Sequence, residues 1–111
     1  MKVAIVGSRT VLVNDIEVFV PEGTTEIVSG GAVGVDSCAR EYAQSVGLPY
    51  TEFEPDYPRY GRAAPIKRND QIVEYADLVI ALWDGTSRGT KYVIDLCKRI
   101  HKPLRMYILR K

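Results

Sequence analysis

Val3-Ala4-Ile5-Val6-Gly7 is a continuous apolar run that stops at a glycine, and Leu78-Val79-Ile80-Ala81-Leu82-Trp83 repeats this pattern later in the chain. Uninterrupted apolar runs of this length are typical of strands covered on both faces, as in a parallel sheet. These two strands are therefore expected to lie side by side at the centre of the sheet.

Shorter strands and amphipathic helices alternate around the two central strands. Strands are expected at residues 26–28, 50–53 and 104–109, and helices at residues 35–46, at residues 65–75 and along the apolar stripe from Tyr92 to Ile100. The helix at 35–46 has the 3.6-residue apolar period, and Gly47 marks its end. This alternation predicts a single domain spanning residues 1–111: an α/β, three-layer Rossmann-like sandwich whose parallel five-stranded sheet has the order 3-2-1-4-5.

Individual residues give four local expectations. Asn14 and Glu17 match the capping box of a short helix. Residues 54–64, rich in Pro, Tyr and Arg, are expected to form a loop, and Pro65 to begin the helix that follows. Asn69 lies on the apolar stripe of that helix, so its amide is expected to be buried and to need a partner.

The composition is that of a globular domain without a strong electric field. The chain has 111 residues, 46% of them hydrophobic and 26% charged, with a net charge of +1, so no overall basic surface indicates nucleic acid. The N-terminal apolar run is too short for a signal peptide or a membrane span, so we expect a cytoplasmic protein without membrane association. Cys38 and Cys97 fall on apolar helix stripes and are expected to be reduced. The chain has one histidine, His101, and no metal centre is expected.

Three turns that follow strands carry small residues suited to a phosphate group. They are Gly7-Ser8-Arg9, Ser29-Gly30-Gly31-Ala32-Val33-Gly34 and Gly85-Thr86-Ser87-Arg88-Gly89-Thr90. The last two run into helices, whose first N–H groups are free and carry a partial positive charge. In the predicted strand order all three turns meet at the sheet edge where open α/β sheets bind ligands. Neither G-x-G-x-x-G after the first strand nor G-x-x-x-x-G-K-[ST] is present, which disfavours a standard dinucleotide fold and a P-loop NTPase.

Neighbouring polar and aromatic residues extend this candidate site. Arg68 has the forked donors that bind phosphate. Trp83 is expected either to stack on a base or to pack in the core, and Asp84 either to accept hydrogen bonds from a ribose or to form the turn. Asp36 lies in a first helical turn, where a carboxylate stabilises the helix whether or not it has a function. The expected ligand-binding residues are Gly7, Ser8, Arg9, Ser29, Gly30, Gly31, Ala32, Gly34, Asp36, Arg68, Asn69, Trp83, Asp84, Gly85, Ser87, Arg88, Gly89 and Thr90.

Four segments, taken together and in this order, match the pattern of a known superfamily. They are Val6-Gly7-Ser8-Arg9, Ser29-Gly30-Gly31-Ala32 through Gly34-Val35-Asp36, Gly61-Arg62-Ala63-Ala64 with Arg68-Asn69, and Ser87-Arg88-Gly89-Thr90. On these segments the chain resembles the short stand-alone members of the SLOG superfamily, a Rossmann-like group that binds nucleotide-derived ligands. The group includes the DNA-processing protein A (Smf) proteins and the Lonely Guy phosphoribohydrolases. The resemblance implies the 3-2-1-4-5 sheet and a ligand site built from these turns.

The chain departs from the hydrolase pattern at one position that matters for catalysis. Lonely Guy hydrolases carry G-G-x-G-T-x-x-E, whose glutamate helps to cleave the bond between base and ribose. Gly89 and Thr90 match the G-T pair, but the third residue after Thr90 is Val93. The preceding turn also lacks the Pro-Gly-Gly run of those enzymes.

Three functions are compatible with these residues. The first is binding or sensing of a nucleotide or nucleotide-derived phosphate ligand, with no cofactor required. The second is a nucleoside-phosphate hydrolase that cleaves an N-glycosidic or phosphate bond of such a ligand, as a nucleotide N-glycosidase or phosphoribohydrolase does. Its candidate catalytic carboxylates are Asp84 and Asp36, with Asp95 as a weaker one. The third, less favoured at this net charge, is a single-stranded DNA-binding module that uses the aromatic and basic residues from Tyr57 to Arg68. Homo-oligomerisation is left open.

Overall fold

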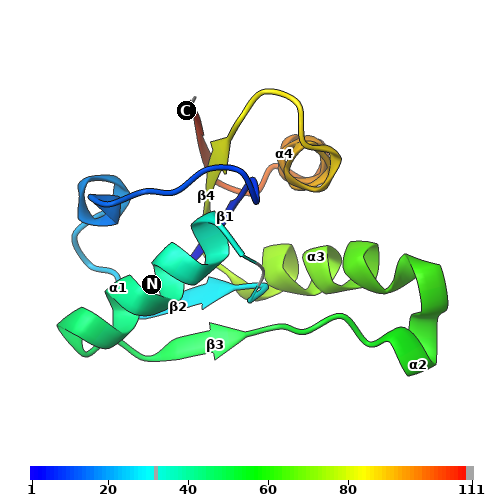
Figure 1. Cartoon of the computed structure of the whole chain (residues 1–111), viewed down its shortest axis with the longest axis horizontal. Helices are drawn as coiled ribbons and strands as arrows, with labels where there is room; N and C mark the ends of the chain where they lie inside the picture. Colours follow the sequence, from blue (N-terminus) through cyan, green and yellow to red (C-terminus); the bar gives the residue numbers. More distant parts are fainter. Residues whose placement is uncertain (32, 110–111) are drawn as a thin grey trace.

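The computed structural model describes residues 1–31 and 33–109 and confirms the predicted α/β architecture (Figure 1). Ala32, which the sequence assigns to the ligand site, lies outside the described residues. Within them the sheet is all-parallel, with the strand order β3-β2-β1-β4-β5. In chain order the elements are β1 (Lys2–Gly7), η1 (Ile16–Phe19), β2 (Glu26–Ser29), α1 (Val35–Val46), β3 (Tyr50–Glu52), α2 (Tyr57–Tyr60), η2 (Gly61–Ala63), α3 (Ala64–Tyr75), β4 (Leu78–Trp83), α4 (Arg88–Ile100) and β5 (Leu104–Ile108).

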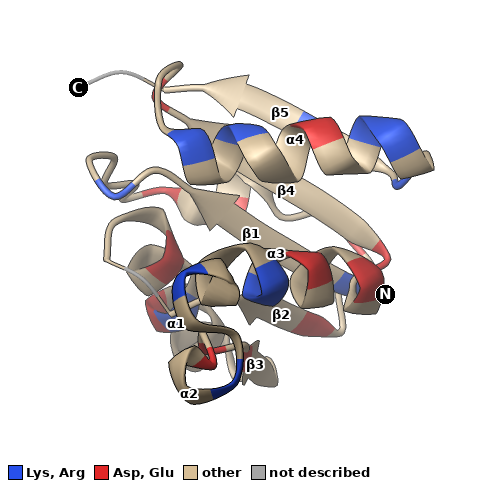
Figure 2. Ribbon diagram, turned by 90° about the vertical axis from the view of Figure 1, so that its right-hand side faces the viewer, with Lys and Arg blue, Asp and Glu red and all other residues tan. Residues whose placement is uncertain are grey.

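Helices cover both faces of the sheet, as the continuous apolar strands require. One face packs against α1 and η1, and the other packs against α3 and α4, which lie side by side in Figure 2. Side chains of β1 alternate between the two cores: Val3 and Ile5 face α1, whereas Ala4 and Val6 face α3 and α4. The described part of the chain has no helix that is both long enough and apolar enough to cross a bilayer.

Two local predictions are wrong. The short helix predicted before Pro21 does form, as the 3-10 helix η1, but the capping box is wrong, because η1 starts after Asp15 and has no side-chain cap. Ile16 is the one buried residue of this turn, and a single turn places its side chain in the core. Residues 54–64 are not a simple loop, because they contain α2 and η2. The Asp56 carboxylate caps α2 by accepting the Arg59 N–H at 3.2 Å, a start signal that the sequence does carry.

Asn69 is also placed differently from the prediction. Its helix begins at Ala64, one residue before the predicted start at Pro65, and Asn69 is half-buried and not part of the core. Ile66, which shares the predicted stripe, is 47% exposed. The stripe enters the core only further along α3, at Ile72 and Val73, because the first turns of α3 face a pocket. Both cysteines are free thiols, as expected.

Gly7 marks a place where the backbone of β1 packs too closely for any side chain. A Cβ atom there would meet the carbonyl oxygen of Leu82 and lie 2.6 Å from Val35 Cγ2. We therefore expect Gly7→Ala to lower the free energy of unfolding by about 1–3 kcal/mol, the usual cost of overpacking. Urea denaturation measures this change. Gly89→Ala is the matched control, since a Cβ at Gly89 meets nothing within 4 Å, and an equal loss in both variants would contradict the packing argument.

Candidate ligand-binding site

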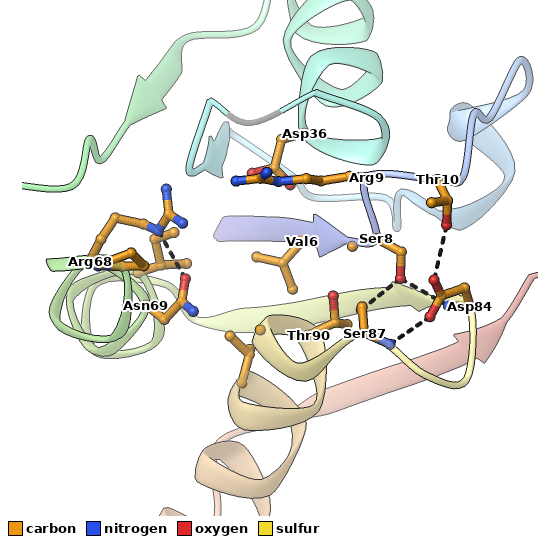
Figure 3. Close-up of a pocket in the computed structure, with 15 residues that line it drawn as sticks. Val6, Ser8, Arg9, Thr10, Asp36, Arg68, Asn69, Asp84, Ser87 and Thr90 are labelled. Atoms are coloured by element: carbon orange, nitrogen blue, oxygen red, sulfur yellow. Dashed lines mark hydrogen bonds between the residues drawn. The ribbon is translucent and has the colours of Figure 1, made fainter. Parts of the chain in front are cut away.

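A pocket of about 350 Å³ opens at the carboxyl ends of β1 and β4, where the strand order reverses (Figure 3). This is the position at which open α/β sheets bind ligands. It is lined by Val6, Gly7, Ser8, Arg9, Thr10, Asp36, Pro65, Arg68, Asn69, Ile72, Asp84, Ser87, Gly89, Thr90 and Val93. All three predicted turns lie at or next to this edge, although not all of their residues reach the pocket.

Ser8 holds the first turn against the third. The residue is 1% exposed, and its hydroxyl accepts the Asp84 N–H at 3.0 Å and lies 2.9 Å from the Ser87 hydroxyl. The second turn packs on the first from the other side, because a Cβ at Gly34 would lie 2.6 Å from the backbone oxygens of Ser8 and Arg9. Ser8 and Gly34 therefore serve chiefly to pack the turns together.

Asp84 forms the third turn with its own carboxylate. Oδ1 accepts the N–H groups of Thr86 and Ser87, each at 2.8 Å, and Oδ2 accepts the Thr10 hydroxyl at 2.9 Å. The hydrogen bonds from Thr86 and then Ser87 lower the pKa of Asp84 far below its ordinary value. The carboxylate is therefore ionised at neutral pH, and it occupies two backbone donors that a phosphate could otherwise use.

The next three N–H groups, at the N-terminus of α4, remain open. The first helical bond runs from the Lys91 N–H to Ser87 O, so Arg88, Gly89 and Thr90 have no acceptor within the helix. Ser87 stands at the N-cap but makes no side-chain cap, because its hydroxyl meets Ser8. In the described part of the chain no other acceptor meets these three N–H groups. A helix end in this state attracts an anion.

Thr90 adds a hydroxyl at the same end of the pocket. Its residue is 5% exposed, and Figure 3 shows its oxygen directed into the pocket. Among residues 1–31 and 33–109 this hydroxyl has no hydrogen-bond partner. Because no fully buried side-chain polar atom of these residues lacks a partner, the Thr90 oxygen must be open to the pocket. The floor beside it is apolar, formed by Val6, Ile72 and Val93, each at most 6% exposed.

Arg68 and Asn69 of α3 face the α4 end from across this floor (Figure 3). The Arg68 guanidinium donates to Gly30 O and to Asn69 Oδ1, both at 2.9 Å. Arg9 is exposed, and its guanidinium overlaps the Asp36 carboxylate in the view of Figure 3. Asp36 is a buried residue, and its carboxylate accepts the Gly30 N–H at 3.2 Å. The pocket thus has two arginines and two carboxylates around an apolar floor.

The remaining predicted site residues do not line the pocket. They are Ser29, Gly30, Gly31, Gly34, Trp83, Gly85 and Arg88. The Trp83 indole packs on the α3 and α4 core and donates to Ser87 O at 3.0 Å, so it braces the third turn. The Ser29 hydroxyl lies 2.6 Å from the Tyr50 hydroxyl and is therefore used within the protein. Burial raises the pKa of Tyr50 to about 12, so this phenol is neutral at pH 7. Arg88 is exposed.

Sequence reasoning missed part of the lining. Thr10, Pro65 and Ile72 line the pocket but were not assigned to it, and neither were Val6 and Val93. A signal for Ile72 exists, because it follows Asn69 by three positions and so shares its helix face. In the described residues no three His, Cys, Asp or Glu side chains gather as a metal site would require.

Asp84→Asn tests the role of this carboxylate in the turn. A folded-state pKa below the ordinary 3.8 means that Asp84 contributes stability above that pH and loses it as pH falls toward the folded-state pKa. We expect the wild type to be more stable than Asp84→Asn at pH 7, with the difference shrinking below about pH 4. Urea denaturation at pH 7, 5 and 3 measures it. A difference that stays constant over this range would contradict the assignment.

No protein-family model, curated protein or solved structure matches the chain.

Proposed function

We propose that the protein binds a nucleotide or nucleotide-derived phosphate compound in this pocket, with its phosphate at the N-terminus of α4. The observation that carries the proposal is the Thr90 hydroxyl, which faces the pocket without a hydrogen-bond partner among the described residues, beside the open N–H groups of Gly89 and Thr90. An anion placed there satisfies all three donors at once. The resemblance to the SLOG superfamily implies the same class of ligand.

The rest of the pocket supports an organic group attached to that phosphate. Its volume of about 350 Å³ lies at the lower end of the range for small-molecule sites, so it suits a ligand of mononucleotide size. Val6, Ile72 and Val93 provide an apolar surface for a flat ring, and α3 supplies polar groups at its far edge. Arg9, which also lines the pocket, adds a cation that can pair with an anionic ligand.

The carboxylates support binding better than hydrolysis. Asp84 is used by the turn, and Asp95 pairs with Lys91 at 2.9 Å on the exposed side of α4. Val93, at the position of the hydrolase glutamate, is an apolar part of the floor. Asp36 is the one remaining pocket-lining carboxylate in the described residues on which a hydrolase proposal could rest.

The aromatic and basic residues around α2 give less support to a DNA-binding module. Tyr60, the half-buried ring of this segment, already has Arg59 5.2 Å and Lys67 6.0 Å from its centre. Neither Arg59 nor Lys67 lines the pocket. The small-molecule pocket is therefore the better-supported site.

A thermal-shift series with nucleoside monophosphates tests the proposal. A ligand at about a hundred times its Kd adds about 2.7 kcal/mol of stability, or roughly 10 °C in Tm for a domain of this size. We expect such a shift for at least one of these compounds. Gly89→Ala should reduce it strongly without unfolding the protein, because the added methyl enters open space beside the three donors.

Arg9→Gln and Arg88→Gln form a matched pair. Arg9 lines the pocket, so Arg9→Gln should weaken binding roughly tenfold, which corresponds to the loss of one charged hydrogen bond. Arg88 is exposed and outside the lining, so its loss should change affinity by less than about twofold. Equal losses in the two variants, or no stabilisation by any mononucleotide, would overturn the proposed function.

A further inference from the structure

The orientation of the Asn69 amide is fixed by its neighbour. Arg68 Nε lies 2.9 Å from the Asn69 side-chain oxygen. A guanidinium has donors only, so the amide atom facing it must be the oxygen. The NH₂ group therefore faces the other way, and Figure 3 shows it directed into the pocket. Within the described ranges no protein acceptor meets this NH₂ group.

Arg68 is itself held in place by the second turn. Its Nη1 donates to Gly30 O at 2.9 Å, and a Cβ at Gly30 would lie only 2.5 Å from that nitrogen. The absence of a side chain at Gly30 therefore gives the guanidinium its position. The N–H of Gly30 is bound in turn by Asp36 at 3.2 Å. The direction of the Asn69 amide is thus set by the backbone of a turn that does not line the pocket.

Asn69 and the proposed phosphate position lie at opposite ends of the apolar floor. Figure 3 places Asn69 on the α3 side, Thr90 and Ser87 on the α4 side, and Val6 between them. A ring joined to a phosphate at α4 would lie on this floor and present its far edge to Asn69. The NH₂ group would then meet whatever polar group that edge carries.

We propose that Asn69 determines the base specificity of the pocket, with Arg68 as its positioning residue, and that the ligand carries an oxo oxygen at the ring edge facing α3. This inference rests on the proposed function, because it needs a nucleotide in the pocket. A fixed NH₂ donor pairs with an oxo group but leaves an exocyclic amino group unpaired, and sites of this kind discriminate against the mismatched group. The pocket therefore selects oxo bases over amino bases.

Inosine and adenosine 5′-monophosphates are the probes, because they differ mainly in a 6-oxo against a 6-amino group. We expect the wild-type protein to bind the inosine compound roughly three- to tenfold more tightly, the worth of one hydrogen bond, in isothermal titration calorimetry. Asn69→Asp should reverse this order, because a carboxylate accepts from an amino group and repels an oxo oxygen. Its other oxygen still accepts from Arg68 Nε, so the local structure is kept.

Two further variants separate specificity from general effects. Gln71→Glu makes the same change of charge on an exposed position of α3 and should leave the ratio of the two affinities unchanged. Gly30→Ala displaces the flexible end of Arg68, the group that its Cβ would meet, and so releases the amide. We expect that variant to stay folded and to bring the ratio close to one.

The outcomes distinguish the two levels of the proposal. Reversal in Asn69→Asp, with the ratio preserved in Gln71→Glu, supports the assignment of Asn69. Binding of both compounds with the same ratio in the wild type and in Asn69→Asp overturns that assignment and leaves nucleotide binding intact. A wild-type protein that binds neither compound nor any other mononucleotide overturns the proposed function itself.

Discussion

The pairing of β1 with β4 is the constraint on which the rest of the site depends. Five consecutive parallel pairs, from Val3 with Leu78 to Gly7 with Leu82, hold these strands together, and the Ser8 N–H extends the ladder to Leu82 O at 3.2 Å. The chain leaves β1 toward the α1 face and leaves β4 toward the α4 face. A crevice must open between the two departing turns, and Ser8 closes its base by bonding to the third turn.

Within that crevice some backbone N–H groups are bound by the protein's own side chains and others stay open. Asp84 takes the N–H groups of Thr86 and Ser87, and this fixes the turn from which α4 starts. The pairing of the Ser87 hydroxyl with Ser8 then leaves the helix without a side-chain cap. The pocket that holds these open N–H groups is lined by two arginines and two carboxylates, so their charges balance, and the chain as a whole has a net charge of only +1. Recognition in such a site depends on directed donors more than on a long-range field.

The fold could be predicted from sequence because its determinants are local. Continuous apolar runs mark β1 and β4 as central, and the strand order follows from placing them together. The segment before α3 is different, because its Pro and Tyr content predicts a loop and only one capping residue, Asp56, indicates the helix that forms there. Periodicity placed Asn69 on the inner side of α3, but the pattern cannot tell whether that side faces core or a pocket at a given turn.

Sequence also located the three turns but not which of their atoms stay open. Glycine and serine content indicates a phosphate-binding turn. It does not indicate that the Asp84 carboxylate and the Trp83 indole hydrogen-bond to the backbone of this turn, because residue spacing does not encode side-chain orientation. The same limit applies to Asn69, whose amide direction depends on Arg68 and on Gly30, a residue 39 positions earlier in the chain.

The proposed ligand has its phosphate at the N-terminus of α4, and this placement can be measured directly. A ¹⁵N–¹H correlation spectrum recorded during titration with inosine 5′-monophosphate tests it residue by residue. We expect saturable shifts that are largest at the amides of Gly89 and Thr90, with smaller changes at Thr86 and Ser87, whose N–H groups stay on Asp84. Saturable shifts centred away from α4, or none at Gly89 and Thr90, would contradict it.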